Sequence, residues 1–250
     1  MSENQKYQND IEKKCLNFVN NNINKKNCFG LSNNQYMELK KWLSEAKPNS
    51  KNKFPDFIFS EGFVEHFAVT SSLENGKGAK QKRESSTFKN NSKANFLGHL
   101  SSYEKTLLSH SYARKFEEHT HFNIVNSIKK NWTKHIESYD KNYSTTEHGI
   151  FLIEYIDTNI ETAVSIEHKP VEIFKTYRIS VDKDMLNWIY SYKEKVEYVI
   201  FVNLFLPSIE VIKIDRIPEL IEKISDVWYA STVGIEVHKY VGYRIRDENI

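Results

Sequence analysis

Two carboxylates in an aromatic stretch of the chain are the residues best suited to chemistry. Asp56 follows a proline, and Glu65 lies in a run of phenylalanine and valine side chains. An acid in such a run costs free energy to bury unless it is paired or used in a site. Two neighbouring carboxylates also repel each other, so the pair needs a cation or a solvated position. An oxygen-ligated divalent ion such as Mg²⁺ would suit both acids.

A β-hairpin is the element that would bring these acids together. Two apolar segments flank Glu61-Gly62, and a glycine can take the positive φ that a two-residue hairpin loop requires. This loop would pair Asp56 with Phe67 and would place Asp56 and Glu65 diagonally on one face of the sheet. In the alternative interpretation, the proline and the aspartate only lead into a strand, and the glutamate faces solvent.

The order of Pro55, Asp56, a short gap and Glu65 on the next strand resembles the PD-(D/E)XK nuclease superfamily, which has the restriction-endonuclease-like fold. The resemblance implies that Asp56 and Glu65 bind Mg²⁺ or Mn²⁺. It also implies a lysine two residues after the glutamate that positions or activates the attacking water. Phe67 occupies that position here. Either a lysine arrives from elsewhere in the chain, or the hairpin binds without cutting.

A basic segment with glycine, serine and asparagine follows at 73–95 and is predicted to be a mobile loop. Its cations would suit a phosphate backbone, from which they displace counterions. A solvated surface segment is the equally weighted alternative. Lys77 and Lys80 are the candidates for a relocated catalytic lysine. The candidate nucleic-acid-binding residues, in this segment and in a later helix, are Lys77, Lys80, Lys82, Arg83, Lys89, Lys129, Lys130 and Lys134.

Hydrophobic periodicity predicts the elements around the hairpin. Helices are expected at 11–19, 35–46, 94–118 and 121–139, after Asp182 and after Pro218; strands are expected at 150–157, 196–203, 209–214 and 235–245. The run at 150–157 has the pattern of a strand buried on both faces. Glu154 within it is a candidate third acidic metal ligand, or else a satisfied acid near a strand end. The segment 159–179 gives no clear pattern.

This order predicts an α/β fold with a mixed central β-sheet flanked by helices. It matches the restriction-endonuclease-like resemblance over roughly residues 35–215. The expected organisation is an N-terminal helical extension at 1–34, a nuclease-like core at 35–215 with the basic insertion 73–95, and a C-terminal helix and strand at 216–250.

Composition narrows the class of protein. The chain has 250 residues, a formal net charge of +2 and 27% charged residues, which suits a globular domain with a polar surface. No run of about 18 apolar residues and no hydrophobic leader is present, so we expect a cytoplasmic protein without a membrane span. Cys15 and Cys28 lack metal-ligand spacing, and zinc held by them with distant histidines is the less favoured interpretation.

The first functional hypothesis is a metal-dependent endonuclease that hydrolyses DNA, in bacterial restriction or phage defence as the resemblance implies. The second is a catalytically inactive nucleic-acid- or protein-binding module of the same fold, in which Phe67 marks a lost active site. The third is an interaction subunit, since 14 tyrosines, 15 phenylalanines and four tryptophans could supply an interface for a homo-oligomer or a defence-system partner.

Overall fold

The computed structural model describes residues 3–49, 54–72, 79–115, 119–142, 148–231 and 235–245. The chain divides into two compact units, each treated by itself. Unit 1 comprises Met1–Ser71 and His119–Thr232, and unit 2 comprises Ser72–Glu118 and Val233–Ile250. Unit 2 therefore includes the whole of the basic segment 73–95 and the C-terminal strand.

The helices are α1 (Glu3–Asn22), α2 (Asn33–Glu45), α3 (Ala79–Ser101), α4 (His121–Asn142), α5 (Lys183–Tyr190) and α6 (Ile217–Lys223). The strands are β1 (Cys28–Phe29), β2 (Lys47–Pro48), β3 (Phe57–Phe59), β4 (Gly62–Val69), β5 (Thr106–Lys115), β6 (His148–Tyr155), β7 (Ile160–Ile166), β8 (Glu172–Phe174), β9 (Tyr198–Asn203), β10 (Ser208–Lys213), β11 (Ile224–Ser231) and β12 (Ile235–Arg244).

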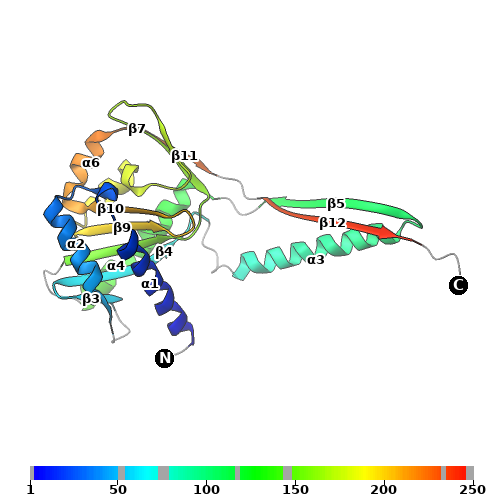
Figure 1. Ribbon diagram of the computed structural model, residues 1–250, viewed down its shortest axis with the longest axis horizontal. Coiled ribbons are helices and arrows are strands. Elements are labelled where there is room, and N and C mark those ends of the chain that lie inside the picture. Colours follow the sequence, from blue (N-terminus) through cyan, green and yellow to red (C-terminus); the bar gives the residue numbers. More distant parts are fainter. Residues whose placement is uncertain are drawn as a thin grey trace. The chain divides into compact units, whose positions relative to one another are not determined.

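Unit 1 is built on a mixed seven-stranded sheet in the order β1-β10-β9-β6-β4-β3-β2 (Figure 1). Strands β4, β6 and β9 are parallel neighbours at its centre, whereas β2, β3 and β4 pair antiparallel. The connection from β4 back to β6 contains α4, as a parallel pair of strands requires a crossover. A separate sheet of three strands has the order β11-β7-β8.

Helices cover both faces of the central sheet, so unit 1 has the three layers of an α/β protein. Alternate residues of the central strands enter two cores, as the period of two in a strand requires. Side chains of α1 and α2 pack on one face with the strand residues Val64, Ile150, Leu152, Ile200 and Val202. Side chains of α4 and α5 pack on the other face with Phe63, Phe67, Phe151, Ile153 and Phe201.

Most predicted elements of unit 1 are confirmed. Ser32 caps α2 through a capping box with Gln35, and Asp182 caps α5 by accepting a hydrogen bond from the Met185 N–H. Pro218 lies in the first turn of α6. The α/β class and the mixed central sheet flanked by helices are likewise as predicted.

Two predictions about unit 2 are wrong. Residues 79–95 belong to helix α3 rather than to a loop, and the helix expected at 94–118 ends at Ser101. Strand β5 follows instead and pairs antiparallel with β12 along its whole length. The apolar residues that suggested one helical stripe include Leu97, Tyr103 and Leu107, which are exposed. A strand whose partner lies far along the chain leaves no local signal that outweighs such a stripe.

The hairpin forms, but with a different register. Phe59 pairs with Gly62, so Ser60 and Glu61 make the turn and the pairing shifts by two residues. Gly62 does not have positive φ; Gly30 is the glycine that does, among the described residues. A Cβ on Gly62 would lie 2.1 Å from the carbonyl oxygen of His148 on the neighbouring strand β6. Close approach of two backbones, not turn geometry, therefore explains this glycine.

Candidate functional site

Asp56 and Glu65 meet across the hairpin. Asp56 immediately precedes β3, and the pairing of Phe57 with Val64 places it directly opposite Glu65 on β4. The backbone N–H of Asp56 donates to Glu65 Oε2 at 3.0 Å, and the N–H of His66 donates to Asp56 Oδ2 at 2.8 Å. One oxygen of each carboxylate is thus fixed by the backbone of the opposite strand. Because the register shift is an even number, the two acids still share a face, opposite each other instead of diagonal.

Burial makes this pair costly without a counter-charge. Glu65 is only 4% exposed, and Asp56 is partly buried. Burial raises the pKa of Asp56 to about 8, helped by the negative charges of Glu65 and Glu12 and opposed by the hydrogen bond from the His66 N–H. A buried carboxyl group with a pKa this high is stable beside another acid only if it carries a proton or binds a cation. The pair therefore needs a proton or a bound cation.

His135 on α4 completes the group around Glu65. Its Nδ1 is hydrogen bonded to Glu65 Oε1, and its side chain is 26% exposed. The ring stacks on Phe67 with centroids 4.9 Å apart and an interplanar angle of 16°. Sequence reasoning missed this histidine. The available signal is its position in the helix, three residues after Trp132 and beside Ile136, at the border of the buried stripe.

Phe67, at the position that the resemblance gives to lysine, is buried at 5% exposure. Besides the stack on His135, it meets Phe151 edge-on at 5.8 Å. In the part of the chain that the structure describes, neither Asp56 nor Glu65 forms an ion pair with a lysine or an arginine; the basic group at the pair is His135.

The predicted basic residues belong either to helix α4 of unit 1 or to unit 2. On α4, Lys130 and Lys134 are exposed, and Lys129 Nζ lies over the Trp188 ring at 5.5 Å from its centroid. The others belong to unit 2: Arg83 and Lys89 are exposed on α3, Lys80 and Lys82 are described only as α3 backbone, and Lys77 lies outside the described residues.

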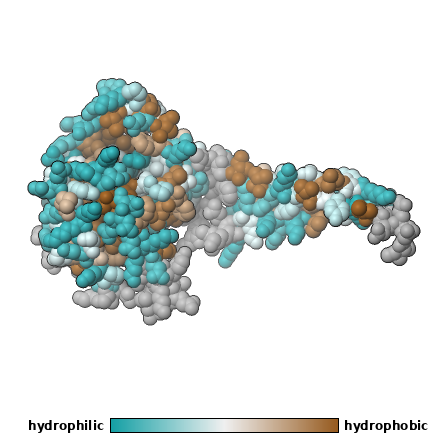
Figure 2. All heavy atoms as spheres, in the orientation of Figure 1, coloured by the Kyte–Doolittle hydropathy of each residue, from teal (hydrophilic) through white to brown (hydrophobic). Residues whose placement is uncertain are grey.

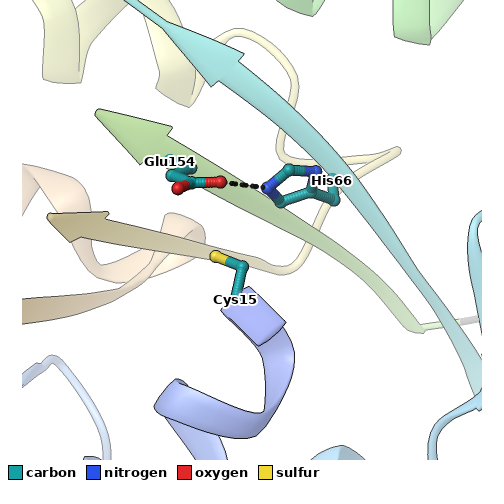
Figure 3. A group of neighbouring side chains, drawn as sticks. All are labelled: Cys15, His66 and Glu154. Atoms are coloured by element: carbon teal, nitrogen blue, oxygen red, sulfur yellow. Dashed lines mark hydrogen bonds and ion pairs between the residues drawn. The ribbon is translucent and has the colours of Figure 1, made fainter. Parts of the chain in front are cut away.

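Glu154 does not join Asp56 and Glu65, which corrects its predicted place as their third ligand. It is aligned with Ala68 across the β4–β6 pair, on the face that α1 and α2 cover, whereas Glu65 faces α4. The carboxylate of Glu154 instead lies 3.0 Å from His66 Nε2, and Cys15 of α1 points towards both (Figure 3). The odd spacing between Glu65 and His66 explains the split, since adjacent strand residues face opposite ways.

Cys15, His66 and Glu154 form a compact group of metal-ligating side chains. One ligand atom from each lies within 4.8 Å of the others. Within the described ranges this is the one such group of three or more histidine, cysteine or acidic side chains. Their exposures are 0%, 4% and 6%. Burial, together with the charge of Glu154, raises the pKa of the Cys15 thiol.

His119 and His121, near the start of α4, are hydrogen bonded to different residues. His119 Nδ1 is hydrogen bonded to the Ser71 hydroxyl at 2.8 Å, and His121 Nε2 to Asp182 Oδ2 at 2.7 Å. The two rings thus have separate partners and do not form a shared ligand site.

Two further findings bear on the class of protein. No helix among the described residues is long and apolar enough to cross a membrane. The function of the Asp56–Glu65 site must be inferred from its own geometry, because no family model matches the chain and no curated protein or solved structure is significantly similar to it.

Proposed function

We propose that the protein is a metal-dependent phosphodiester hydrolase that acts on DNA, with Asp56 and Glu65 as its metal ligands. The observation that carries the proposal is the direct opposition of these two acids, with the pKa of Asp56 raised to about 8 by burial and by its acidic neighbours. Perturbed acids with a specific charged neighbour mark candidate functional sites. A restriction-endonuclease-like fold, and a role in bacterial restriction or phage defence, belong to the same proposal.

The order of elements supports it. Helix α2 leads into the β2-β3-β4 antiparallel strands, and α4 then crosses to the buried parallel strand β6. A helix before the hairpin and a central helix after it are what the resemblance implies for this fold. In this proposal, Asp56 at the entrance of β3 and Glu65 within β4 correspond to the two acidic residues of the motif.

The two acids fit Mg²⁺ or Mn²⁺. Magnesium commonly binds through one or two carboxylates and fills its other positions with water and substrate phosphate oxygens. A cation here would also offset the repulsion by Glu65 and Glu12 that, after burial, raises the pKa of Asp56. When bound, such an ion lowers the pKa of a coordinated water and offsets negative charge on the phosphate.

Among the described residues, His135 is the basic group bonded to this acid pair, and it can hold a proton in the part that the resemblance gives to a lysine. Its Nδ1 is bonded to Glu65, and its ring orientation is fixed by the stack on Phe67. An imidazole can accept a proton on one ring nitrogen while the other is hydrogen bonded, which suits a general acid or base. We assign His135 this part in the proposed hydrolysis.

Phe67 favours a second candidate function, in which the same fold binds nucleic acid or a protein without cutting. The phenyl ring fills the place of the expected ammonium group, and no lysine of the described ranges is paired with either acid. In this alternative the acids hold a cation that positions a phosphate or a carboxylate of the partner.

A cleavage assay separates the two candidates. Plasmid and single-stranded DNA would be incubated with the purified protein in Mg²⁺ or Mn²⁺, with a chelator as control. Hydrolysis should depend on the metal and should fall at least about 100-fold in Asp56→Asn and His135→Ala, as for the loss of a main electrostatic group in an active site. Glu61→Gln is the matched control, since Glu61 is a half-exposed acid in the turn of the same hairpin.

Binding measurements complete the test. DNA binding that requires Asp56 and a divalent ion, without any cleavage, would support the inactive module. If the protein neither cleaves nor binds DNA, and Asp56→Asn does not change its affinity for Mg²⁺ or Mn²⁺, both candidates are wrong.

A further inference from the structure

The face of β4 opposite Glu65 carries a second set of ligands, contributed by three separate elements. Cys15 comes from α1, His66 from β4 and Glu154 from β6 (Figure 3). We propose that these three side chains bind a zinc-class transition-metal ion that fastens α1 to the central sheet. The site is distinct from the Asp56–Glu65 pair and does not depend on the function proposed for that pair.

The donor atoms select the class of metal. A thiolate, an imidazole nitrogen and a carboxylate oxygen suit Zn²⁺ or Co²⁺, whereas Mg²⁺ and Ca²⁺ prefer oxygen ligands alone. A tetrahedral ion with zinc-like bond lengths needs ligand atoms roughly 3.3–3.8 Å apart. The ligand atoms here lie within 4.8 Å of one another, and His66 Nε2 and Glu154 Oε2 are 3.0 Å apart. Small side-chain movements would therefore suffice to bind the ion.

Charge balance also favours a divalent ion. A thiolate and a carboxylate carry two negative charges, so with a neutral imidazole and a divalent cation the buried site has no net charge. Burying a carboxylate is costly, and Glu154 is 6% exposed with the single imidazole of His66 as its partner among the described residues, so an ion would add a second partner. His66 presents Nε2 to this group, 3.0 Å from Glu154 Oε2, and its side chain is buried at 4% exposure.

The same three residue types could form a thiol nucleophile with its base, but this arrangement does not fit that role. Cys15 is 0% exposed, so no substrate can reach its sulfur. In a catalytic relay the thiol and the acid bond to different nitrogens of the histidine. Here Glu154 occupies Nε2 while Nδ1 has no partner. A sealed site of this kind is structural.

The site also reaches the Asp56–Glu65 pair through the backbone. The N–H of His66 donates to Asp56 Oδ2. An ion that fixes the His66 side chain would therefore hold the strand segment that orients Asp56. In metalloproteins, loss of a group that orients a metal ligand typically lowers metal affinity 10–100-fold.

Titration of the full-length, metal-stripped protein with Zn²⁺ and Co²⁺ tests the site in the absence of magnesium and DNA. We expect one equivalent to bind, with a thiolate-to-cobalt charge-transfer band for Co²⁺. Cys15→Ser should abolish the band and lower Zn²⁺ affinity at least about 100-fold, beyond the usual loss of an orienting partner. Cys28→Ser is the matched control, because Cys28 is the other cysteine of the chain and should leave the band and the affinity unchanged.

Glu154→Gln keeps the result interpretable if Cys15→Ser does not fold. This variant retains the thiolate, so it should keep the charge-transfer band while its affinity for Zn²⁺ falls. Zn²⁺ should also raise the unfolding temperature of the wild type and of Cys28→Ser. Absence of saturable binding to the wild type, or a band that survives Cys15→Ser, would overturn the site. Because no nuclease assay is involved, such a failure would leave the proposed hydrolase untouched.

Discussion

At the residue scale, the central fact is that Glu65 and His66 are neighbours on one strand and face opposite sides of the sheet. Glu65 meets His135 of α4, and His66 meets Glu154 on the side that α1 covers. A strand buried on both faces normally carries apolar residues at every position. β4 instead carries an acid and a histidine at its centre: Glu65 is hydrogen bonded to His135 of α4, and His66 to Glu154 of the neighbouring strand β6. Their shared place in the strand is why one chain can offer ligands of two kinds.

The first prediction concerns Asp56 in the protein freed of metal by a chelator. Its folded-state pKa of about 8 lies above the unfolded value of about 3.9, so the folded state binds the proton more tightly. The stability of the wild type should therefore fall as the pH rises from about 4 to about 8. Asp56→Asn removes this loss and should be at least about 1.4 kcal/mol more stable at pH 8, the value of one pKa unit.

Urea unfolding at several pH values measures this difference. The gain in Asp56→Asn should shrink towards pH 4, and added Mg²⁺ should stabilise the wild type but not the variant. A variant that is less stable than the wild type at pH 8 would show that Asp56 is not under electrostatic strain.

At the element scale, the hairpin is held against β6 by a backbone contact that admits no side chain. Gly62→Ala would bring a Cβ to 2.1 Å from the carbonyl oxygen of His148, so the strands must move apart. We expect a loss of about 1–3 kcal/mol or more in unfolding free energy, the usual cost of overpacking. Chemical denaturation measures it.

Gly98→Ala is the natural comparison, since a Cβ there meets nothing within 4 Å. Gly98 lies in α3, where alanine is favoured over glycine by about 1 kcal/mol. Equal effects of the two substitutions would contradict the explanation by close approach.

The start of α5 gives a third prediction. Asp182 accepts hydrogen bonds from the Met185 N–H and the Tyr177 hydroxyl and pairs with His121. Burial raises the pKa of Asp182, but these hydrogen bonds outweigh burial and lower it overall. Its contribution to stability is therefore complete above about pH 3.9 and is lost as the pH falls through the lowered folded-state value.

Asp182→Ala should lower the unfolding free energy at pH 7 by about 1–3 kcal/mol, the range for a lost cap and its unpaired partners. The difference from the wild type should narrow below about pH 3.9. Asp184→Asn, two residues further along and exposed, should change the unfolding free energy little at either pH. A constant difference across the acid range would show that the carboxylate charge plays no part.

Elements with local signals could be predicted from the sequence, and those without could not. The capping box at Ser32 and the cap at Asp182 each act within one turn, and the apolar stripe of α4 repeats every three to four residues. The strand β5 depends on β12, which lies far along the chain, so local propensity misleads there.

The candidate sites divide in the same way. Asp56 and Glu65 lie on one hairpin, and their meeting follows from local pairing. His135 and Cys15 reach the sheet through the packing of whole helices, which no spacing in the sequence reveals.

At the scale of the whole molecule, unit 2 has a small core of its own. Helix α3 packs on one face of the two-stranded β5–β12 sheet, where Phe96 is 4% exposed and stacks on Tyr240 at 5.6 Å. The other face leaves hydrophobic side chains open, as Figure 2 shows; they are Leu107, Ile235, Val237, Val241 and Tyr243. A two-stranded sheet is marginal alone, so within the described residues the α3 contact is its main support.

Phe96→Ala therefore tests how unit 2 is held together. Truncating a buried phenylalanine costs about 3–5 kcal/mol, which is comparable with the whole stability of a unit this small. We expect β5 and β12 to lose protection from hydrogen exchange, and α3 to become open to proteolysis. Leu97→Ala, one residue along and half exposed, should leave both readouts unchanged.

The tryptophans allow unit 1 to be followed in the same sample, because all four lie within it: Trp42, Trp132, Trp188 and Trp228. Their fluorescence transition in urea should keep its midpoint in Phe96→Ala if unit 1 folds around its own two cores. A shift of that midpoint by as much as the loss expected in unit 2 would mean that the two units unfold as one. In that case the division of the chain into separately stabilised parts would be wrong, because a cavity in unit 2 would lower the unfolding free energy of unit 1 as well.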